Sequence, residues 1–162
     1  MKHVASHRSE SLALYTDAQR IRRDTSIWTT VQAILAPAQF IAFLMSLALV
    51  LHFLLTGDGY GAATVSIVIK TGFLYAIMIT GAIWEKVVFG QFLFAPAFFW
   101  EDLFSFAVIA LHTAYLWALF GSVLSPTGLM VLALAAYAAY AINAAQFLRK
   151  LRMARLEAET AA

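Results

Sequence analysis

The most constraining feature of the sequence is an apolar stretch from Ile27 to Leu55 that contains no Asp, Glu, Lys or Arg. A helix of about 20 apolar residues crosses the hydrocarbon layer of a membrane, so this stretch is long enough to span one. Three further apolar stretches follow it, at about 62–88, 99–120 and 129–148. We therefore expect an all-α integral membrane protein whose main part is a four-transmembrane-helix bundle.

Short segments of turn-forming residues separate the predicted helices. The glycine-rich segment 56–61 and the segment 122–128, which contains Pro and Gly, predict turns. The 90–98 connection contains Pro96, which disfavours continuation of the second helix. Pro37 lies far inside the first helix, where it favours a bend rather than an end.

Charged residues make up only 12% of the chain, and most of them flank the apolar stretches. The basic residues that precede the first stretch or follow the last are Lys2, Arg8, Arg20, Arg22, Arg23, Arg149, Lys150, Arg152 and Arg155. Because Lys and Arg favour the cytoplasmic side, we expect both termini and the 89–98 connection to be cytoplasmic. The turns at 56–61 and 121–128 then face the other side. This distribution favours anionic lipid headgroups, and no nucleic acid, as the partner of the basic residues.

The same pattern divides the chain into three parts: a polar basic N-terminal segment (1–26), a four-helix transmembrane domain (27–150) and a cytoplasmic C-terminal tail (151–162). The first segment lacks the apolar stretch of a cleavable signal, so we expect it to remain in the mature protein. Thr16 and Gln19 have the spacing of a capping box, and 17–23 is then a short basic helix on the membrane surface. The alternative is a disordered basic tail. His3 and His7 have helical metal-ligand spacing but carry no prediction.

Ionisable residues gather at the hairpin between the second and third predicted helices. Trp84-Glu85-Lys86 closes one helix and Trp100-Glu101-Asp102 opens the next, so antiparallel packing brings both triplets to the cytoplasmic boundary. An ordinary membrane interface explains them as an aromatic belt with a snorkelling lysine. Alternatively, a partly buried acid beside other acids tends to keep its proton and is then a proton donor. The polar residues expected in the same half of the bundle are Gln32, Gln39, Asn143 and Gln146.

A second ionisable group lies deeper, where Lys70 and His112 reach a similar depth on neighbouring helices. Two interpretations of His112 stay open: a hydrogen bond to a helix carbonyl or to Tyr115, or an axial ligand for the metal of a bound pigment. Lys70 either faces the same cavity or snorkels outward.

Several function classes have no support in the sequence. There is no cysteine, which excludes disulfides, thiolate nucleophiles and cysteine-ligated clusters. A glycine-rich phosphate loop, an HExxH zinc motif and a G-x-S-x-G elbow are also missing, so nucleotide, zinc-hydrolase and serine-hydrolase chemistry is not indicated. Thirteen Phe, six Tyr and four Trp make a flat apolar ligand plausible.

Four segments carry a resemblance to a known family: RDTSIW (23–28), GAIWEKVVFGQFLFAPAFFWEDLFS (81–105), LHTAYL (111–116) and NAAQFLRKLR (143–152). Over residues 14–155 the chain resembles the 3-vinyl bacteriochlorophyllide hydratase family of phototrophic bacteria. The resemblance implies a multi-pass hydro-lyase of the bacterial inner membrane, cytoplasmic or intracytoplasmic, in bacteriochlorophyll biosynthesis. Its expected reaction adds water to the ring-A 3-vinyl group of chlorophyllide or bacteriochlorophyllide and gives a 1-hydroxyethyl group. The alternative is a non-enzymatic tetrapyrrole carrier or photosystem assembly protein.

The resemblance also implies which partners the chain has and whether it needs a cofactor. The magnesium tetrapyrrole and membrane lipid are expected partners, with other enzymes of the pathway or a second copy of the chain as further candidates. We expect no cofactor, because the magnesium belongs to the substrate.

The implied reaction needs an acid, a positioned water molecule and a group that takes the proton of that water. The candidate catalytic acids are Glu101, Glu85 and Asp102, in that order. Glu101 comes first because Ser105, Val108 and His112 continue its helical face toward the interior, whereas Asp102 is rotated by about 100°. Lys86 or a basic residue of the flanks is expected to pair with the propionate of the pigment. The candidate substrate-binding residues are Trp84, Lys86, Trp100, Lys70, His112, Gln39 and Asn143.

Overall fold

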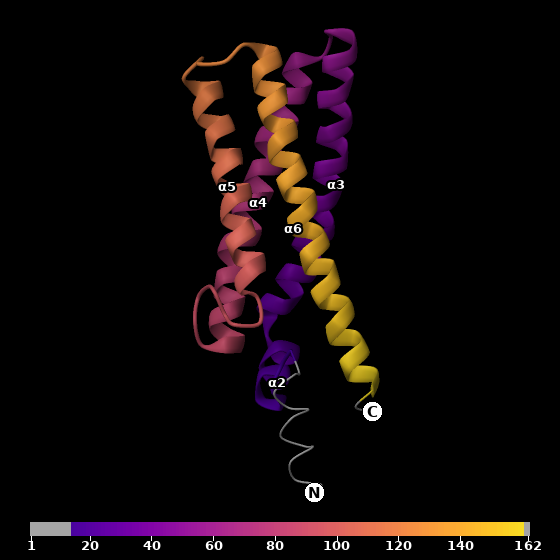
Figure 1. Ribbon diagram of the computed structural model, residues 1–162, viewed down its shortest axis with the longest axis vertical. Coiled ribbons are helices and arrows are strands. Elements are labelled where there is room, and N and C mark those ends of the chain that lie inside the picture. The colour runs from indigo at the N-terminus through magenta and orange to yellow at the C-terminus, as the bar shows by residue number, and fades with distance from the viewer. Residues whose placement is uncertain (1–13, 161–162) are drawn as a thin grey trace, which may run out of the picture.

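The structure is a computed structural model and describes residues 14–160 of the chain. His3, His7 and most of the predicted N-terminal segment lie outside the described residues. Within residues 14–160 the secondary structure is helical throughout: α2 (Asp17–Thr25), α3 (Ile27–Thr56), α4 (Tyr60–Phe89), α5 (Phe99–Phe120) and α6 (Pro126–Thr160) (Figure 1). Helices α3, α4, α5 and α6 are each long and apolar enough to cross a membrane. The prediction of an all-α protein with long apolar helices is therefore confirmed.

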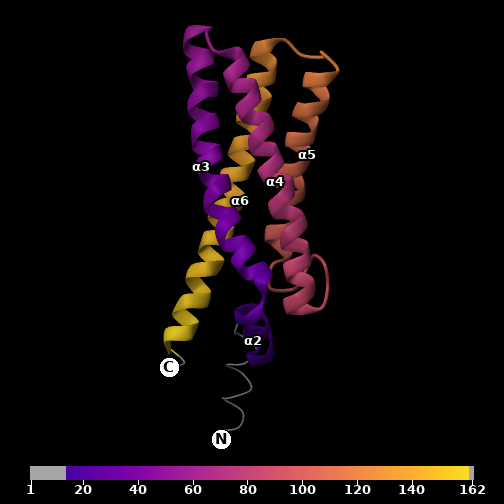
Figure 2. The same cartoon turned by 180° about the vertical axis from the view of Figure 1, so that it is seen from behind.

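The long helices run side by side, with α3 packed most extensively on α4 and α5 on α6 (Figures 1 and 2). One end of the bundle carries α2, the 90–98 linker between α4 and α5, and the C-terminal end of α6. The short turns between α3 and α4 and between α5 and α6 lie at the other end. This arrangement places the ionisable residues that flank the linker at the same end of the bundle as the basic end of α6.

Local sequence explains where the helices begin and end. Ser26 caps α3, because its hydroxyl accepts a hydrogen bond of 3.2 Å from the Trp28 amide. Gly57 and Gly90 end α3 and α4 with φ values of 80° and 89°, in the left-handed region that glycine adopts without strain. Pro37 lies within α3 and does not end it.

The predicted capping box of α2 is present. The Gln19 amide donates to the Thr16 hydroxyl at 3.3 Å, and the Thr16 amide donates to the Gln19 side chain at 2.9 Å. Of the two alternatives for this region, the structure therefore has the short helix and not the disordered tail. Arg23 extends from α2 over the ring of Tyr15, 4.8 Å from its centroid.

Helix α6 is longer than predicted. The sequence indicated an end near Leu148 and a separate tail from residue 151, but the helix continues to Thr160. Arg, Lys, Leu, Met, Ala and Glu dominate 149–159, and all have high helix propensity, so nothing in this segment breaks the helix once it has left the apolar stretch. The extension meets the start of the described chain, where the Leu14 amide donates to the Glu157 carboxyl at 3.0 Å.

The interior of the bundle contains both apolar and polar side chains, while large apolar side chains cover its outside. Val50, Ile67 and Met130 are fully buried at the centre. On the outside, Leu55 is 84% exposed and Ile79 is 63% exposed. An apolar outer surface suits a hydrocarbon solvent, in which helices associate through close packing and interhelical hydrogen bonds.

Two isoleucines of α4 provide a matched test of this packing. Ile67→Ala leaves a cavity among α3, α4 and α6 that neighbouring side chains do not fill, so we expect a loss of about 2 kcal/mol in the free energy of unfolding. Ile79→Ala removes the same atoms from the outer surface, where lipid replaces them, and should change stability little. Unfolding measured in lipid bicelles tests both. Equal losses for the two variants would contradict the arrangement of α4.

Candidate functional site

The three acids singled out in the sequence lie at one end of the bundle, where α4, the linker and α5 meet. Glu85 and Glu101 are each 5% exposed and Asp102 is 4% exposed. Acidic side chains are seldom this buried unless they are bonded or functional. The contacts of the three differ, and these contacts divide the acids into two kinds.

Glu85 and Asp102 anchor the linker. The Ala95 amide donates to Glu85 Oε2 at 3.2 Å, and the Phe94 amide donates to Asp102 Oδ2 at 2.7 Å. Phe94 has a φ of 60°, which is uncommon for a residue with a side chain and shows how tightly the linker turns. Each of the two carboxyl groups thus accepts a backbone amide of the linker. Both groups are therefore committed to holding the linker.

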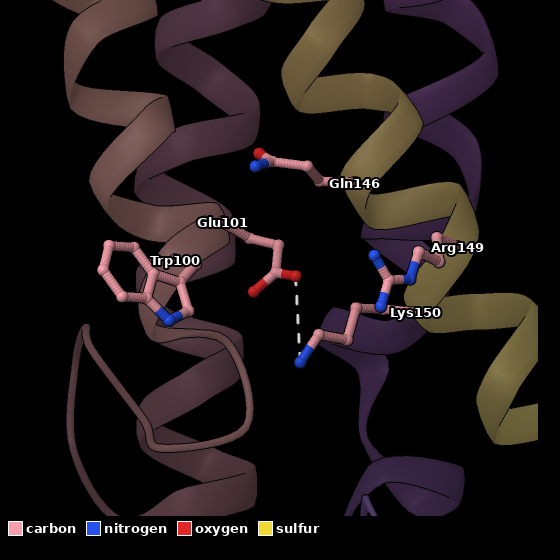
Figure 3. A pocket seen from close by; sticks show the side chains of 5 residues that line it. All are labelled: Trp100, Glu101, Gln146, Arg149 and Lys150. Carbon is pink, nitrogen blue, oxygen red and sulfur yellow. Dashed lines mark ion pairs between the residues drawn. The ribbon is translucent and has the colours of Figure 1, made fainter.

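Glu101 instead lines a pocket between α5 and α6 of about 300 Å³ (Figure 3). The other lining residues are Trp100, Gln146, Arg149 and Lys150. Glu101 Oε1 lies 3.7 Å from Lys150 Nζ, and Glu101 Oε2 is buried without a hydrogen-bond partner. Among the three acids, Glu101 thus has an oxygen available to a molecule in this pocket.

The helical face that contains Glu101 continues into the bundle, as the sequence predicted. Ser105 and His112 are buried on this face of α5. Asn143 of α6 donates to the Ser105 hydroxyl at 2.8 Å, which joins the two helices one turn above Glu101. Asp102 is buried as well, because the linker folds over it, but it faces the linker rather than the pocket.

Lys86 lies at the same end of the bundle as the three acids, but its side chain is directed away from them. Its Nζ donates to the Gly90 carbonyl at 2.8 Å and lies 5.4 Å from the centroid of the Phe92 ring. One residue along a helix turns the side chain by about 100°, so Lys86 points away from Glu85 and toward the carbonyls at the end of its own helix. The lysine beside Glu101 is Lys150, which also donates to the Ala97 carbonyl at 2.5 Å.

Exposed aromatic side chains extend from Lys86 to the pocket. We call them the aromatic face: Phe92, Phe94, Phe99, Trp100 and Phe106. All five are at least 37% exposed. Phe94 stacks on Phe106 and contacts Phe99, and Phe99 packs edge-to-face on Trp100, with ring centroids 5.5–5.6 Å apart. The face is therefore continuous at the start of α5 and ends beside Glu101.

Trp84 lies on the inner side of the linker. Its indole nitrogen donates to the Thr29 hydroxyl at 2.9 Å, and its ring packs edge-to-face on Phe89 and Phe98. Trp84 thus joins α3, α4 and the linker, while Trp100 is the tryptophan at the pocket. A role for Trp84 in substrate binding stays a prediction.

The deep pair predicted from the sequence is in direct contact. Lys70 Nζ lies 2.7 Å from His112 Nε2, and both residues are fully buried. His112 Nδ1 donates to the Val108 carbonyl at 2.8 Å, so Nε2 is the nitrogen that accepts from Lys70. The helix-carbonyl interpretation of His112 is the one observed, and Lys70 does not snorkel. Lys70 Nζ also lies 4.1 Å from the centroid of the Tyr140 ring.

The remaining candidates are Gln39 and Asn143, which are buried on α3 and α6. A second pocket, of about 320 Å³, lies on α3 and α4 and is lined by Leu35, Ile69, Gly72, Phe73 and Ala76. It contains no ionisable group. Within residues 14–160 no three His, Asp or Glu side chains are grouped to hold a metal ion.

The sequence reasoning missed the part that α6 plays in the pocket. Arg149 and Lys150 were treated as part of a basic flank that sets membrane orientation, and Gln146 was placed only in the correct half of the bundle. Their spacing from Asn143 was the available signal, because positions three to four apart along a helix share a face.

The helices are apolar and long enough to span a membrane, and they surround a buried carboxyl group at a pocket. These features define a polytopic membrane protein with a candidate acid–base site. The chain belongs to the 2-vinyl bacteriochlorophyllide hydratase family, whose model matches residues 15–153. This name numbers the vinyl group 2 and the name used above numbers it 3, following different numbering schemes for the macrocycle.

Two relatives named 2-vinyl bacteriochlorophyllide hydratase are similar to the chain over most of its length. The protein of Cereibacter sphaeroides is 70% identical over 149 residues, which are 91% of this chain and 92% of the relative. The protein of Rhodobacter capsulatus is 70% identical over 147 residues, which are 90% of this chain and 85% of the relative. No solved structure matches the chain significantly.

The Lys70–His112 contact is open to a double-mutant test. His112→Leu removes the acceptor of a buried Lys70 Nζ, and we expect a loss of about 2 kcal/mol in the free energy of unfolding. Adding Lys70→Met should recover part of that loss, because both polar partners are then gone. Unfolding of the single and double variants in bicelles measures the coupling. Strictly additive losses would show that the two side chains do not interact.

Proposed function

We propose that this chain is a membrane hydratase that adds water to the ring-A vinyl group of a chlorophyllide or bacteriochlorophyllide. The 70% identity to relatives named as hydratases, over about nine-tenths of the chain, supports this activity. The observation that carries the mechanism is Glu101, a buried carboxyl group with an unpartnered oxygen at a pocket. Such a group is suited to general acid catalysis.

The proposed reaction proceeds in two steps at Glu101. The carboxyl group gives its proton to the terminal carbon of the vinyl group, and the π electrons of the double bond form the new C–H bond. The inner carbon is then a cation that the conjugated macrocycle delocalises. A water oxygen bonds to this carbon and loses a proton, which returns to the Glu101 carboxylate. The sum is the addition of one water molecule, without oxidation or reduction and without a cofactor.

The neighbours of Glu101 support this cycle. Lys150 Nζ, 3.7 Å from Oε1, stabilises the carboxylate that forms when the proton has left. Gln146 extends into the same pocket on the side of Glu101 away from the linker, where its amide can orient a water molecule (Figure 3). Glu85 and Asp102 act by holding the linker, and with it Trp100, in place.

The aromatic face suits the shape of the substrate. The vinyl group on ring A and the propionate on ring D leave a flat macrocycle at well-separated points of its rim. Lys86 and the Glu101 pocket likewise lie at opposite ends of the aromatic face, and its exposed rings offer a flat apolar surface. We place the propionate at Lys86 and the vinyl group at Glu101, with the macrocycle between them. Arg149 and Lys150 then flank the reacting edge and do not bind the propionate.

Glu101→Gln tests the proton donor. The amide keeps the shape of the side chain but has no acidic proton, so we expect hydration to slow by about 10²- to 10⁴-fold while pigment still binds. The assay incubates purified protein with a vinyl chlorophyllide in water labelled with oxygen-18 and follows the hydrated product by mass spectrometry. Glu85→Gln and Asp102→Asn are the matched controls and should lose stability more than rate per folded molecule.

Near-normal hydration by Glu101→Gln would exclude Glu101 as the donor. A collapse of rate only in Glu85→Gln or Asp102→Asn would transfer that role to the pair at the linker. Pigment binding without hydration by the unmodified chain would point instead to a carrier.

Lys86→Met tests the placement of the propionate. We expect KM for the chlorophyllide to rise about fivefold with kcat unchanged, the effect of one exposed ion pair. Lys86→Arg should restore KM, and Arg155→Met, at the far end of α6, is the control. Because salt screens an exposed pair, raising ionic strength should raise KM for the unmodified chain and not for Lys86→Met. The same salt dependence in both would disprove the placement.

We propose further that the chain lies in the bacterial inner membrane with both termini and the linker in the cytoplasm. The basic residues of the N-terminal region and of α6 support this orientation. Because the chain has no cysteine, Asp58→Cys and Ser125→Cys each introduce a single thiol. An impermeant thiol reagent applied outside spheroplasts should label both. Labelling only after the membrane is opened would reverse the orientation.

A further inference from the structure

Four buried oxygen atoms between the helices have no hydrogen-bond partner: Gln39 Oε1, Glu101 Oε2, Asn143 Oδ1 and Gln146 Oε1. Gln39 is 3% exposed, Glu101 is 5% exposed and Asn143 is 7% exposed. Buried side-chain oxygens in proteins almost always have a partner, so a group of them indicates a ligand that donates hydrogen bonds. The other unpartnered oxygens among the described residues are the hydroxyls of Thr64 and Tyr115, which lie close enough to pair with each other.

Three of these oxygens, all except that of Glu101, belong to one polar strip, made of Gln39, Ser105, Tyr140, Asn143 and Gln146. Tyr140, Asn143 and Gln146 follow one another at intervals of three residues on α6, which places them along one side of the helix. Ser105 joins the strip through its 2.8 Å bond with Asn143, and the side chain of Gln39 on α3 lies close enough to that of Tyr140 to pair with it.

The polar strip connects the deep pair with the pocket. At its inner end Tyr140 lies against Lys70, and at its outer end Gln146 lines the pocket of Glu101. From Tyr140 to Gln146 the helix rises about 9 Å, which is the approximate length of this connection. Polar side chains are thus spaced along α6 from the deep pair to the candidate reaction centre.

The chemistry of the strip indicates its ligand. Amide and carboxyl oxygens accept hydrogen bonds, so the ligand must donate them and must be small enough to lie between packed helices. Water meets both conditions, and a buried water molecule typically bonds two to four protein groups. Exchanging the oxygen and nitrogen of an amide would leave an unpaired donor in place of an acceptor, and water satisfies that as well.

We propose that the polar strip binds internal water molecules and supplies from them the water that hydrates the vinyl group. This inference rests on the proposed function, in which water is the second substrate. The macrocycle lies on the aromatic face and covers that side of the vinyl group, so the water that reacts is expected to approach from the opposite, protein side. The strip approaches Glu101 from the interior of the bundle. Water held there reaches the cation from the protein side once the proton has been transferred.

Variants at Asn143 test the supply of water. Asn143→Leu removes the free acceptor, and we expect kcat to fall roughly tenfold, the effect of one lost hydrogen bond to the reacting water, with KM for the pigment unchanged. Asn143→Asp keeps acceptor oxygens and should restore most of kcat. The control is Gln32→Leu, since the Gln32 amide at a comparable depth already bonds Thr80 at 2.7 Å and lies outside the strip.

An osmolyte that is too large to enter the bundle lowers the activity of water outside it. The response of each variant to this osmolyte distinguishes a loss of water supply from a packing defect. The unmodified chain and Gln32→Leu should keep their rates, because the strip holds water tightly. Asn143→Leu should slow in proportion to the activity of water. If Asn143→Leu keeps the rate and the osmolyte response of the unmodified chain, the inference is wrong. If the unmodified chain hydrates no pigment, the proposed function fails, and the next measurement still decides whether the strip binds water.

Radiolytic labelling in water enriched in oxygen-18 detects bound water without any turnover. Hydroxyl radicals formed from water inside a protein modify the side chains next to that water. Tyr140, which is 7% exposed, should take up the label in the unmodified chain and lose it in the Gln39→Leu/Asn143→Leu double variant. Tyr115, fully buried and outside the strip, is the internal control and should stay unlabelled. An unlabelled Tyr140 in the unmodified chain would show that the strip is dry.

Discussion

The candidate site depends on the hydrogen bonds by which two buried carboxyl groups hold the linker in place. Residues 90–98 are the longest non-helical segment of the described chain, and backbone amides that are buried within it, such as that of Ala95, need acceptors. Glu85 and Asp102 provide those acceptors from the helices on either side of the linker. The turn at Phe94 then directs aromatic side chains outward and brings α5 into position. The aromatic face and the pocket at Glu101 both follow from this arrangement.

The three acids therefore have separate roles although they are similarly buried. The two that bind the linker each accept one of its backbone amides, and the one that faces α6 keeps a buried oxygen without a partner. The same division applies deeper in the bundle, where Lys70 and His112 satisfy each other and the oxygens of the polar strip remain unpaired. The polar groups that hold the linker and the deep pair in place are hydrogen-bonded, whereas Glu101 and the amides of the polar strip, which are proposed to act on substrate or water, each keep an oxygen without a partner.

Much of this architecture was predictable from sequence, because a helix that crosses a membrane is recognised by its apolar length and its lack of charged residues. The bounds of α5 follow from charge and apolar length alone, and the shared face of Glu101, Ser105 and His112 follows from helical periodicity. The direction of the Lys86 side chain was not predictable from the triplet alone, since a single step along a helix decides which way a side chain points. Lys150 was missed because its partner lies 49 positions earlier in the chain and only the packing of α6 on α5 brings them together. The free oxygens of the strip were not predictable either, because bonding states depend on the partners that packing supplies.

A structure of Glu101→Gln with an unreacted vinyl chlorophyllide bound is the most direct test of the central claim, that the vinyl group reacts at Glu101 while the macrocycle lies on the aromatic face. The decisive measurement is the distance from the terminal vinyl carbon to the side chain at position 101. Our account predicts contact at about 3–3.5 Å, as in other reactive complexes, with the propionate at Lys86. A macrocycle seated instead in the apolar pocket on α3 and α4, beside Ile69 and Phe73, would contradict it.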